Sequence, residues 1–589
     1  MFGTNWTLSP RQYDVMVQED YVIPLRDGTR LAGVLYRPRT ETPVPLLLGF
    51  HPYPNDQQTM PLRPVGFGLQ RGHMEAGDPT FYARRGYAHG IFNVRGTGKS
   101  SGVYQAMGKL EGDDVAEAIE WLARRPWCDG NVGMFGVSYF SRLAIQVAAR
   151  APKPLRAIFA PYGLTDLYRD LYYHGGIFTH GFVSGWRQKL DALRYESLYR
   201  QRHGEAAFRA AISRAQEDDE LMAIDAVRAA LERPDDPRSA IIVDLVLEPL
   251  DGEYYTERRV DYGRTHVPGY FGACWNIYGL QLGAAFRNFE QWQGPKKLLI
   301  GPPHYLDRPL YQLQFESLRW FDHWLKGNDT GFMDESPVRL FQPGPSTWRA
   351  AEEWPLKETR WLPFYLHEDG TLSEHELFEG AVGAQFEDSP FGHGALTYRT
   401  PPLVERTEVL GPAALTLYAS TSDTELLVFA SVFKVDAEGR EDEISRGWLR
   451  ASQRELDPEG SRPWAPRHLH RRREELRPGE VYRLDVAITP FAATLAPGER
   501  LGLRLKAADD EARPDPLRAT AFGHVFRQEA ARIRIHASPR EASCLAVPIV
   551  SGNVQETYFS GGRLEMPGPL PLAKMQRPKP TPEGYGEDA

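Results

Sequence analysis

The chain has 589 residues, of which 42% are apolar, 12% aromatic and 25% charged. This composition is typical of a globular protein, and the length predicts two or three domains. The net charge of -9 offers no broad attraction for nucleic acid or for an acidic membrane surface, so neither is an expected partner.

The spacing of the cysteines and the pattern of the first residues argue against disulfide-rich, metal-binding, secreted and membrane-spanning proteins. Cys128, Cys274 and Cys544 are far apart and form no metal-ligand pattern, so we expect no disulfide framework and no metal site. The first residues lack a basic region followed by an apolar run, and no stretch approaches the roughly 20 apolar residues of a membrane helix. A cytoplasmic location is expected. The basic run "RHLHRRREE", Arg467 to Glu475, is followed directly by acids and is predicted to be a solvated loop.

The first 160 residues alternate between strand and helix patterns. "YVIPLRDGTRLAGVLYRP" predicts a hairpin, and "VPLLLGF" predicts a buried strand. "DDVAEAIEWLARRP" predicts an amphipathic helix that begins at Asp113 and Asp114 and ends before Pro126. "NVGMFGV" is then a strand that leads into Ser138, with a helix after it. This alternation predicts a parallel sheet with crossover helices.

Two later regions have different patterns. The strand pattern stops near Tyr162, where an aromatic and glycine-rich stretch precedes charged helices, and resumes after Val267. Beyond about residue 350, short alternating runs such as "AALTLYAS", "VYRLDVAI" and "ARIRIHAS" are separated by Gly, Pro and Asp turns, which predicts a β-sandwich. The fold expected is an α/β domain with a helical insertion and a C-terminal β-sandwich. The expected boundaries are 1–161 and 267–350 for the α/β domain, 162–266 for the insertion, 351–575 for the sandwich and 576–589 for a loose tail.

Ser138 lies in "GMFGVSYFSR", between a predicted strand and a predicted helix. A serine on such a sharp turn exposes its hydroxyl above the sheet edge, and the helix N-terminus directs free amides toward a nearby oxyanion. The string departs from the GxSxG nucleophile elbow because Phe140 occupies the place of the last glycine. A second string, "NVRGTGKSSG", is not a phosphate-binding loop, since Asn93 stands where that motif needs its first glycine.

Three strings, in this order along the chain, carry a resemblance to a known family: "FNVRGTGKSSGVY", "EWLARRPWCDGNVGMFGVSYFS" and "LRWFDHWLKGNDTGFMDESPVRLF". Together with the late β-region, they resemble the cocaine esterase-type (CocE/NonD) hydrolases, relatives of the X-prolyl dipeptidyl peptidases and α-amino acid ester hydrolases. The resemblance implies an α/β-hydrolase domain, an inserted helical cap and a C-terminal jelly roll. It also implies a Ser-His-Asp triad, an oxyanion hole and no metal or organic cofactor.

The family pattern assigns roles to individual residues of this chain. Ser138 matches the nucleophile, and His304 in "LLIGPPHYLD" matches the catalytic histidine, the general base and then general acid. The N–H of Tyr139 and the hydroxyl of Tyr53 match the oxyanion donors, which are worth about 3–4 kcal/mol in such sites. Asn276 in "ACWN" stands where the family has its aspartate.

An asparagine at the acid position leaves several interpretations open. It can accept a hydrogen bond from the imidazole, but it cannot stabilise imidazolium by charge, and the Asp-to-Asn exchange slows a serine protease about 10⁴-fold. Asn276 can serve in a slower Ser-His-Asn site, or another carboxylate, Asp307, Asp251 or Asp261, can orient His304. The chain can also have lost hydrolysis and kept binding, or the segment can align differently. Acyl transfer, carbon–carbon cleavage and elimination remain alternatives to ester or amide hydrolysis.

Aromatic residues in the insertion and near the acid position suggest the substrate. They predict a mostly apolar pocket for a small molecule, an acyl ester or amide with a hydrophobic or aromatic part. The expected pocket residues are Tyr172, His174, Phe178, Trp186 and Trp275. The jelly roll is expected to wall the active site, and family resemblance alone leaves self-association open.

Overall fold

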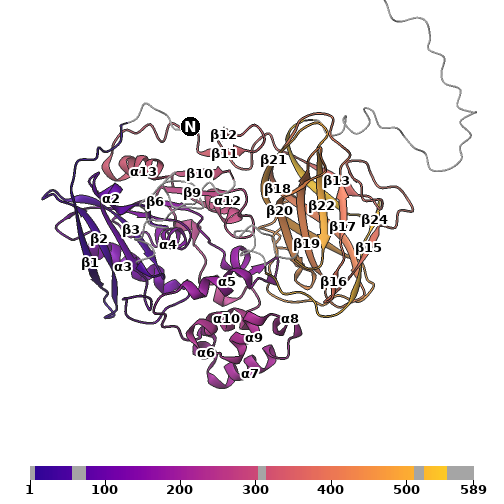
Figure 1. Cartoon of the computed structure of the whole chain (residues 1–589), viewed down its shortest axis with the longest axis horizontal. Coiled ribbons are helices and arrows are strands. Elements are labelled where there is room, and N and C mark those ends of the chain that lie inside the picture. Colours follow the sequence, from indigo (N-terminus) through magenta and orange to yellow (C-terminus); the bar gives the residue numbers. More distant parts are fainter. Residues whose placement is uncertain (1–6, 56–74, 303–312, 510–522, 553–589) are drawn as a thin grey trace, which may run out of the picture.

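The computed structural model describes residues 7–55, 75–302, 313–509 and 523–552, so the predicted catalytic His304, the alternative acid Asp307 and the tail at 576–589 lie outside the described residues. Two large sheets stand side by side, and a group of helices lies beneath the gap between their ribbons (Figure 1). The N-terminal sheet and the helices around it form the α/β-hydrolase part, and the second sheet forms the C-terminal sandwich.

The N-terminal sheet has ten strands in the order β1-β2-β4-β3-β5-β6-β9-β10-β11-β12. The seven strands from β4 to β11 in this order are parallel, and β1, β2 and β12 pair antiparallel at the edges. Every residue of β3, β4 and β9 is buried, as expected for strands covered on both faces. The strand bounds are β1 Val15–Pro24, β2 Arg30–Pro38, β3 Val44–His51, β4 Ala88–Asn93, β5 Cys128–Phe135, β6 Leu155–Pro161, β9 Gly269–Cys274, β10 Lys296–Gly301, β11 Val338–Gln342 and β12 Thr347–Ala351.

Five helices pack against this sheet: α2 Pro79–Ala83, α3 Lys109–Leu122, α4 Tyr139–Ala148, α12 Leu282–Gln291 and α13 Gln314–Lys326. Helix α3 begins four residues before the predicted start at Asp113. Its first turn is stabilised by Glu111, whose carboxylate accepts the N–H of Met107 at 2.7 Å, a contact that helix-start signals in the sequence did not indicate.

The predicted insertion is mostly helical. It opens with a π-helix at Tyr168–Tyr172 and a two-residue hairpin, which the sequence did not predict. The bounds of its elements are β7 Tyr173–His174, β8 Ile177–Phe178, α5 Gly181–Trp186, α6 Leu198–His203, α7 Glu205–Ala215, α8 Asp219–Met222, α9 Asp225–Glu232, α10 Pro237–Leu247 and α11 Glu253–Thr256, with 3₁₀ turns at Arg187–Lys189 and Tyr262–Arg264. Helix α5 lies between the two sheets, and α6 to α10 lie below them (Figure 1).

The C-terminal sheet is antiparallel and wraps on itself as a β-sandwich around its own buried cluster. Its path is β14-β13-β26-β18-β21-β20-β19-β22-β17, with β15, β16 and β23 branching from it. The bounds are β13 Arg360–Leu366, β14 Leu372–Ser373, β15 Ala384–Ser389, β16 Gly392–His393, β17 Leu396–Arg399, β18 Thr407–Thr421, β19 Leu427–Val435, β20 Glu441–Arg450, β21 Tyr482–Leu495, β22 Arg500–Lys506, β23 Ala531–Ile535, β24 Ala537–Ser538, β25 Glu541–Ala542 and β26 Cys544–Ser551, with a 3₁₀ turn at Ala451–Gln453.

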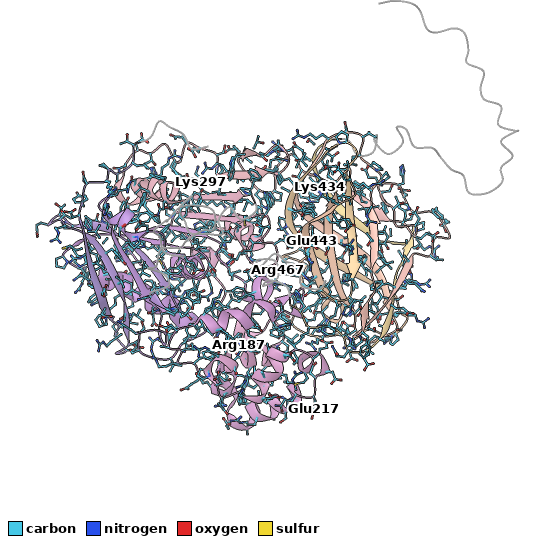
Figure 2. The ribbon with its side chains drawn as sticks, viewed as in Figure 1. Arg187, Glu217, Lys297, Lys434, Glu443 and Arg467 are labelled. Atoms are coloured by element: carbon cyan, nitrogen blue, oxygen red, sulfur yellow. The ribbon has the colours of Figure 1, made fainter. Side chains whose placement is uncertain are left out.

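The sandwich is packed onto the other two parts. Its Leu427, Phe429 and Trp448 belong to the same buried cluster as the core of the N-terminal sheet and the cap. Glu443, on β20, lies on the side of the sandwich that faces the hydrolase part (Figure 2), and its carboxylate accepts a hydrogen bond from Tyr278 at 2.5 Å. The three parts therefore meet along a shared, partly charged junction.

Among the described residues, no helix combines the length and the apolar character that a membrane-crossing segment needs. The prediction of a solvated loop at Arg467 to Glu475 is wrong for its first half. His468 and His470 are only 5% and 3% exposed, while residues 471–475 are exposed. Arg169 donates to the carbonyl of His468 at 2.6 Å, and this contact holds the start of the run against the cap.

Candidate active site

Ser138 forms the corner between β5 and α4. Its backbone has φ 59° and ψ −113°, a conformation that side-chain-bearing residues rarely adopt and that costs about 1–3 kcal/mol. The Ser138 N–H donates to the carbonyl of Pro161 on the neighbouring strand β6 at 3.4 Å, and its own carbonyl accepts the N–H of Arg142 at 2.9 Å. Ser138 thus sits at the carboxyl end of the parallel sheet, where α/β proteins place their ligands.

Phe140, the departure from the GxSxG pattern, is accommodated by glycines elsewhere. A Cβ atom added to Gly136 would come within 2.3 Å of the Phe140 Cβ, and one added to Gly49 of β3 would come within 2.7 Å of its ring. On the same side, the ring stacks against His51 with 5.0 Å between centroids. Gly49 and Gly136 therefore leave the space that Phe140 needs and allow α4 to approach β3 closely.

The two predicted oxyanion donors, the Tyr139 N–H and the Tyr53 hydroxyl, have defined surroundings. The Tyr139 N–H belongs to the first residue of α4, and the first N–H groups of a helix have no acceptor within it. The Tyr53 hydroxyl accepts a hydrogen bond from Trp186 Nε1 at 3.1 Å, which leaves its proton to donate elsewhere. Burial, together with Glu75, raises the pKa of Tyr53 well above its ordinary value, so the phenol stays protonated. The rings of Tyr53 and Tyr139 pack edge to face at 6.1 Å.

The hydroxyl of Tyr139 is held by a buried polar network. Its hydroxyl donates to Glu111 Oε2 at 2.5 Å and lies 3.0 Å from the hydroxyl of Tyr104. The network fixes the first turn of α4, and with it the direction of the Tyr139 N–H.

Gln281 contacts the serine hydroxyl directly. Its Nε2 donates to Ser138 Oγ at 3.1 Å, from the residue that precedes α12. Because Oγ accepts here, its own proton remains available to a base. Sequence reasoning missed Gln281, since a loop glutamine five residues beyond Asn276 matches no catalytic motif.

Asn276 follows β9 and is 5% exposed. Its Oδ1 accepts from the thiol of Cys274 at 2.9 Å, and that sulfur accepts from the Tyr162 hydroxyl at 3.0 Å. In the sheet, Cys274 pairs with Gly301, the last residue of β10, so the chain leaves both strands at the same edge. His304, three residues after Gly301 in sequence, lies outside the described residues, and the role of Asn276 remains a prediction.

Two alternative acids have other partners. Asp251 forms an ion pair with Arg169 at 2.7 Å and another with Arg259. Asp261 caps a 3₁₀ turn by accepting the N–H of Gly263 at 3.1 Å. Both carboxylates are thus engaged within the segment between β6 and β9.

Glu75 is a further acid at this corner that the sequence did not single out. Its carbonyl accepts the N–H of Val137, next to Ser138, at 2.9 Å. Burial raises the pKa of its carboxyl from 4.5 to about 8, with Lys189 opposing the shift. A carboxyl near Tyr53, the predicted oxyanion donor, is therefore neutral over much of the physiological pH range.

The predicted pocket residues separate into two groups. Trp186 joins the site through Tyr53 and stacks on Tyr139 at 6.4 Å, and Tyr172 is close enough to Tyr53 to influence its pKa. The other three have neighbours elsewhere. His174 Nδ1 lies 2.9 Å from His524 Nε2 of the sandwich, Phe178 packs on Tyr173 at 5.2 Å, and Trp275 donates to the carbonyl of Phe341 at 2.7 Å.

Comparison with known proteins gives matches along most of the chain. Residues 27–305 match the family model described as X-Pro dipeptidyl-peptidase (S15 family), and residues 330–546 match the X-Pro dipeptidyl-peptidase C-terminal non-catalytic domain. A cocaine esterase from a Rhodococcus species is 25% identical, over 91% of this chain and 98% of the relative. A putative serine esterase from Mycobacterium bovis is 26% identical, over 92% and 98%.

Solved structures share the fold. A CocE/NonD family hydrolase from Staphylococcus aureus has a TM-score of 0.75 at 24% identity, covering 91% of this chain and 94% of its own. An α-amino acid ester hydrolase has a TM-score of 0.68 at 18% identity, covering 92% and 98%.

The packing beneath Phe140 predicts the effect of a single methyl group. Gly49→Ala should lower the free energy of unfolding by about 1–3 kcal/mol, because the new methyl overlaps the ring. Adding Phe140→Leu should recover part of the loss. Thermal unfolding measures both, with Gly185→Ala as the control, since a Cβ there has no atom within 4 Å. Equal unfolding temperatures for Gly49→Ala and the control would contradict this packing.

Glu75 predicts a pH dependence of stability. Between pH 4.5 and about 8, the Glu75 carboxyl keeps its proton in the folded chain but has lost it in the unfolded chain. The contribution of Glu75 to the free energy of unfolding therefore falls as pH rises through this window. Glu75→Gln removes the effect, and the difference in unfolding temperature between variant and wild type should increase in favour of the variant from pH 5 to pH 8. A difference independent of pH would show that Glu75 ionises normally.

Proposed function

Since the chain belongs to the cocaine esterase-type (CocE/NonD) family of serine hydrolases, we propose that it cleaves an acyl ester or amide bearing an apolar or aromatic group through an acyl-Ser138 intermediate. The observation that carries this proposal is the strained corner at Ser138, with Gln281 donating to its Oγ and the Tyr139 N–H at the start of the helix that follows it. Strain of this kind at a serine is typical of a nucleophile elbow.

In the first half of the reaction Ser138 Oγ attacks the carbonyl carbon of the substrate. His304 takes the serine proton as general base and then gives it to the leaving alcohol or amine. The Tyr139 N–H and the Tyr53 O–H donate to the oxygen that becomes negative. Because Tyr53 is anchored by Trp186 and remains protonated, its donor is already oriented before charge develops.

In the second half a water molecule attacks the acyl carbon while His304 accepts its proton. The histidine then returns the proton to Ser138 Oγ as the bond between the acyl carbon and Oγ breaks and the acid leaves. Asn276 orients the imidazole through its amide oxygen, which already accepts the Cys274 thiol. Without a carboxylate, the imidazolium formed in each step is less stabilised, and water attack is slowed. A slow second step favours transfer of the acyl group to an alcohol or amine when one is present.

The substrate class follows from the rings at the site. Trp186, Tyr139 and Tyr53 pack in sequence along one wall, and all three are buried. Such a wall suits a flat or branched apolar acyl group. Tyr278, two residues after Asn276, donates to Glu443 of the sandwich, which supports a sandwich packed against this end of the sheet.

Rapid mixing with p-nitrophenyl acetate tests the proposal. The wild-type protein should release about one equivalent of p-nitrophenol in a burst, followed by a slower steady phase, because acylation outpaces deacylation at a site without a carboxylate. Ser138→Ala should show neither phase. Steady turnover that persists in Ser138→Ala would contradict the assignment of the nucleophile.

Asn276→Asp tests the acid position. The Cys274 thiol can donate to a carboxylate as it does to the amide oxygen, so the substitution fits without repacking. The slow phase should accelerate by at least tenfold, and transfer to added alcohol should fall relative to hydrolysis. Asn276→Ala is the matched control and should slow both phases. An unchanged slow phase in Asn276→Asp would show that another carboxylate orients the histidine.

A further inference from the structure

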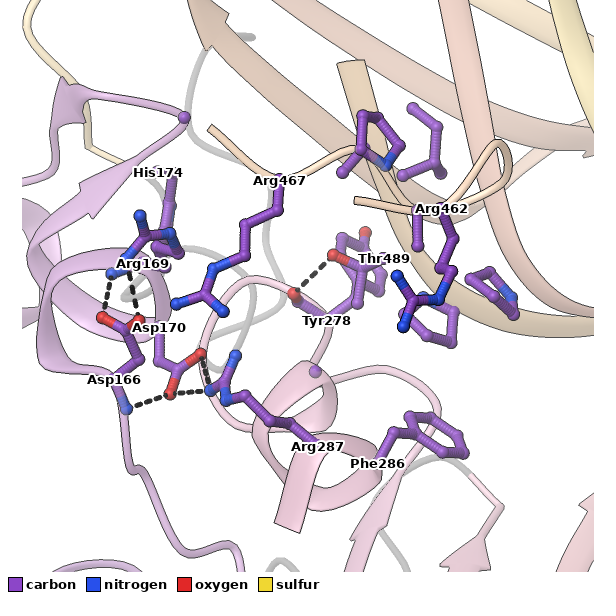
Figure 3. A pocket seen from close by; sticks show the side chains of 18 of the residues that line it. Asp166, Arg169, Asp170, His174, Tyr278, Phe286, Arg287, Arg462, Arg467 and Thr489 are labelled. Carbon is purple, nitrogen blue, oxygen red and sulfur yellow. Dashed lines mark hydrogen bonds and ion pairs between the residues drawn. The ribbon is translucent and has the colours of Figure 1, made fainter. Parts of the chain in front are cut away.

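A cavity of about 710 Å³ lies where the hydrolase part, the cap and the sandwich meet (Figure 3). Its walls come from α12, from the segment that opens the cap, and from a sandwich loop around residues 460–470. Gln281, just before α12, contacts Ser138, while residues 278–280 before it and Phe286 and Arg287 within the helix line the cavity. Ser138, Tyr53 and Asn276 are not among its lining residues.

Three arginines near one wall are matched by three buried carboxylates. Arg287 pairs with Asp170 at 2.5 Å. Arg169 pairs with both Asp166 and Asp251, at 2.8 and 2.7 Å. Asp251 also pairs with Arg259. These charges neutralise one another, which accounts for their burial without a ligand.

Arg462 and Arg467 are not matched in this way. The Arg462 guanidinium donates to the carbonyls of Glu459 and Ser461, in its own loop. Arg467 lies 3.7 Å from Asp457, whose carboxylate is shared with two backbone N–H groups. Figure 3 shows both guanidinium groups extending from the sandwich loop into the cavity. Burial, with Arg169 and Arg287 acting in the same direction, lowers the pKa of Arg467, while Asp166 and Asp457 oppose the shift.

Unsatisfied nitrogen atoms lie in the same walls. Arg169 Nε and His468 Nε2 are buried and have no hydrogen-bond partner among the described residues. His468 is 5% exposed, and burial lowers its pKa to about 4, so the ring adds no charge at neutral pH. Glu290 also lines the cavity, and burial raises its pKa to about 7, so it carries a full negative charge only above that pH. The cavity is therefore rich in donors and suits a ligand with one negative charge.

Flat apolar surfaces adjoin the two arginines. Trp354 stacks on Phe286 with 4.0 Å between centroids, and Trp464 stacks on Trp361 at 4.2 Å. Trp354, Phe286 and Trp464 all line the cavity. Each indole is thereby held in place, which lowers the entropy lost when a ligand packs against it.

We propose that this cavity is a second ligand site, separate from the acyl site, that binds an organic carboxylate with a flat apolar body. Arg462 and Arg467 hold the carboxylate, and Trp354 and Trp464 pack against the body. Guanidinium groups recognise the two oxygens of a carboxylate in a planar, charge-assisted geometry. The volume lies within the range of small-molecule sites.

Calorimetric titration of the full chain with 2-naphthoate tests this site. One equivalent should bind, and 2-naphthalenemethanol, the neutral analogue, should bind at least tenfold more weakly. Arg462→Gln with Arg467→Gln should weaken 2-naphthoate binding at least tenfold. Arg472→Gln is the matched control, an exposed arginine of the same segment paired with Glu455 at 2.9 Å, and should bind as the wild type does.

Unfolding temperatures establish that each variant is folded. If the double variant is unstable, Arg462→Gln alone is titrated instead, since this exposed side chain can be replaced without disturbing the core. Binding should also persist after Ser138 is blocked with a phosphonate. No binding at millimolar 2-naphthoate, equal binding of the alcohol, an unchanged affinity in the arginine variants, or loss of binding on blocking Ser138 would each overturn the proposal.

Discussion

The strained backbone of Ser138 is the constraint on which the rest of the site depends. A side-chain-bearing residue at φ 59° persists only where its surroundings hold it there. Here Phe140 packs into space left by Gly49 and Gly136, and the first turn of α4 is tied to Glu111 through Tyr139. These contacts aim the serine hydroxyl, the Tyr139 N–H and the helix dipole at one point above the sheet edge.

The sandwich is joined to the cap through buried polar contacts rather than through loose docking. His524 Nδ1 lies at hydrogen-bond distance, 2.6 Å, from Asp509 Oδ2, and its Nε2 lies 2.9 Å from His174 Nδ1 of the cap. Although burial opposes ionisation, His524 and Arg446 hold the pKa of Asp509 at about 2, and burial lowers the pKa of His174 to about 3. Arg446 also bonds to Glu443, the partner of Tyr278, at 2.8 Å. Cap, sandwich and the loop after β9 are thus coupled through one polar chain, which fixes the walls of both the acyl site and the arginine-lined cavity.

Local patterns predicted the architecture well, because strand alternation and turn residues act over short distances. The strands that lead to Ser138, Asn276 and His304 fall where the alternation placed them, and the late runs of alternating residues form the sandwich. The contacts that depend on tertiary packing could not be predicted from the sequence. Gln281 reaches Ser138 only because β9 and α12 fold back to it, and the burial of His468 follows from its carbonyl accepting Arg169 of the cap. The glycine that makes room for Phe140 is on a strand some 90 residues earlier, too distant for a motif to reveal.

The central claim is that Ser138 carries the acyl group, and peptide mapping of the acid-quenched protein tests it most directly. Wild-type protein is mixed with p-nitrophenyl acetate, stopped within the burst, and digested for mass spectrometry. The account predicts one acetyl group, on the peptide that contains Ser138 and at that residue. An unmodified Ser138 peptide, or an acetyl group on a different residue that turns over with substrate, would contradict it.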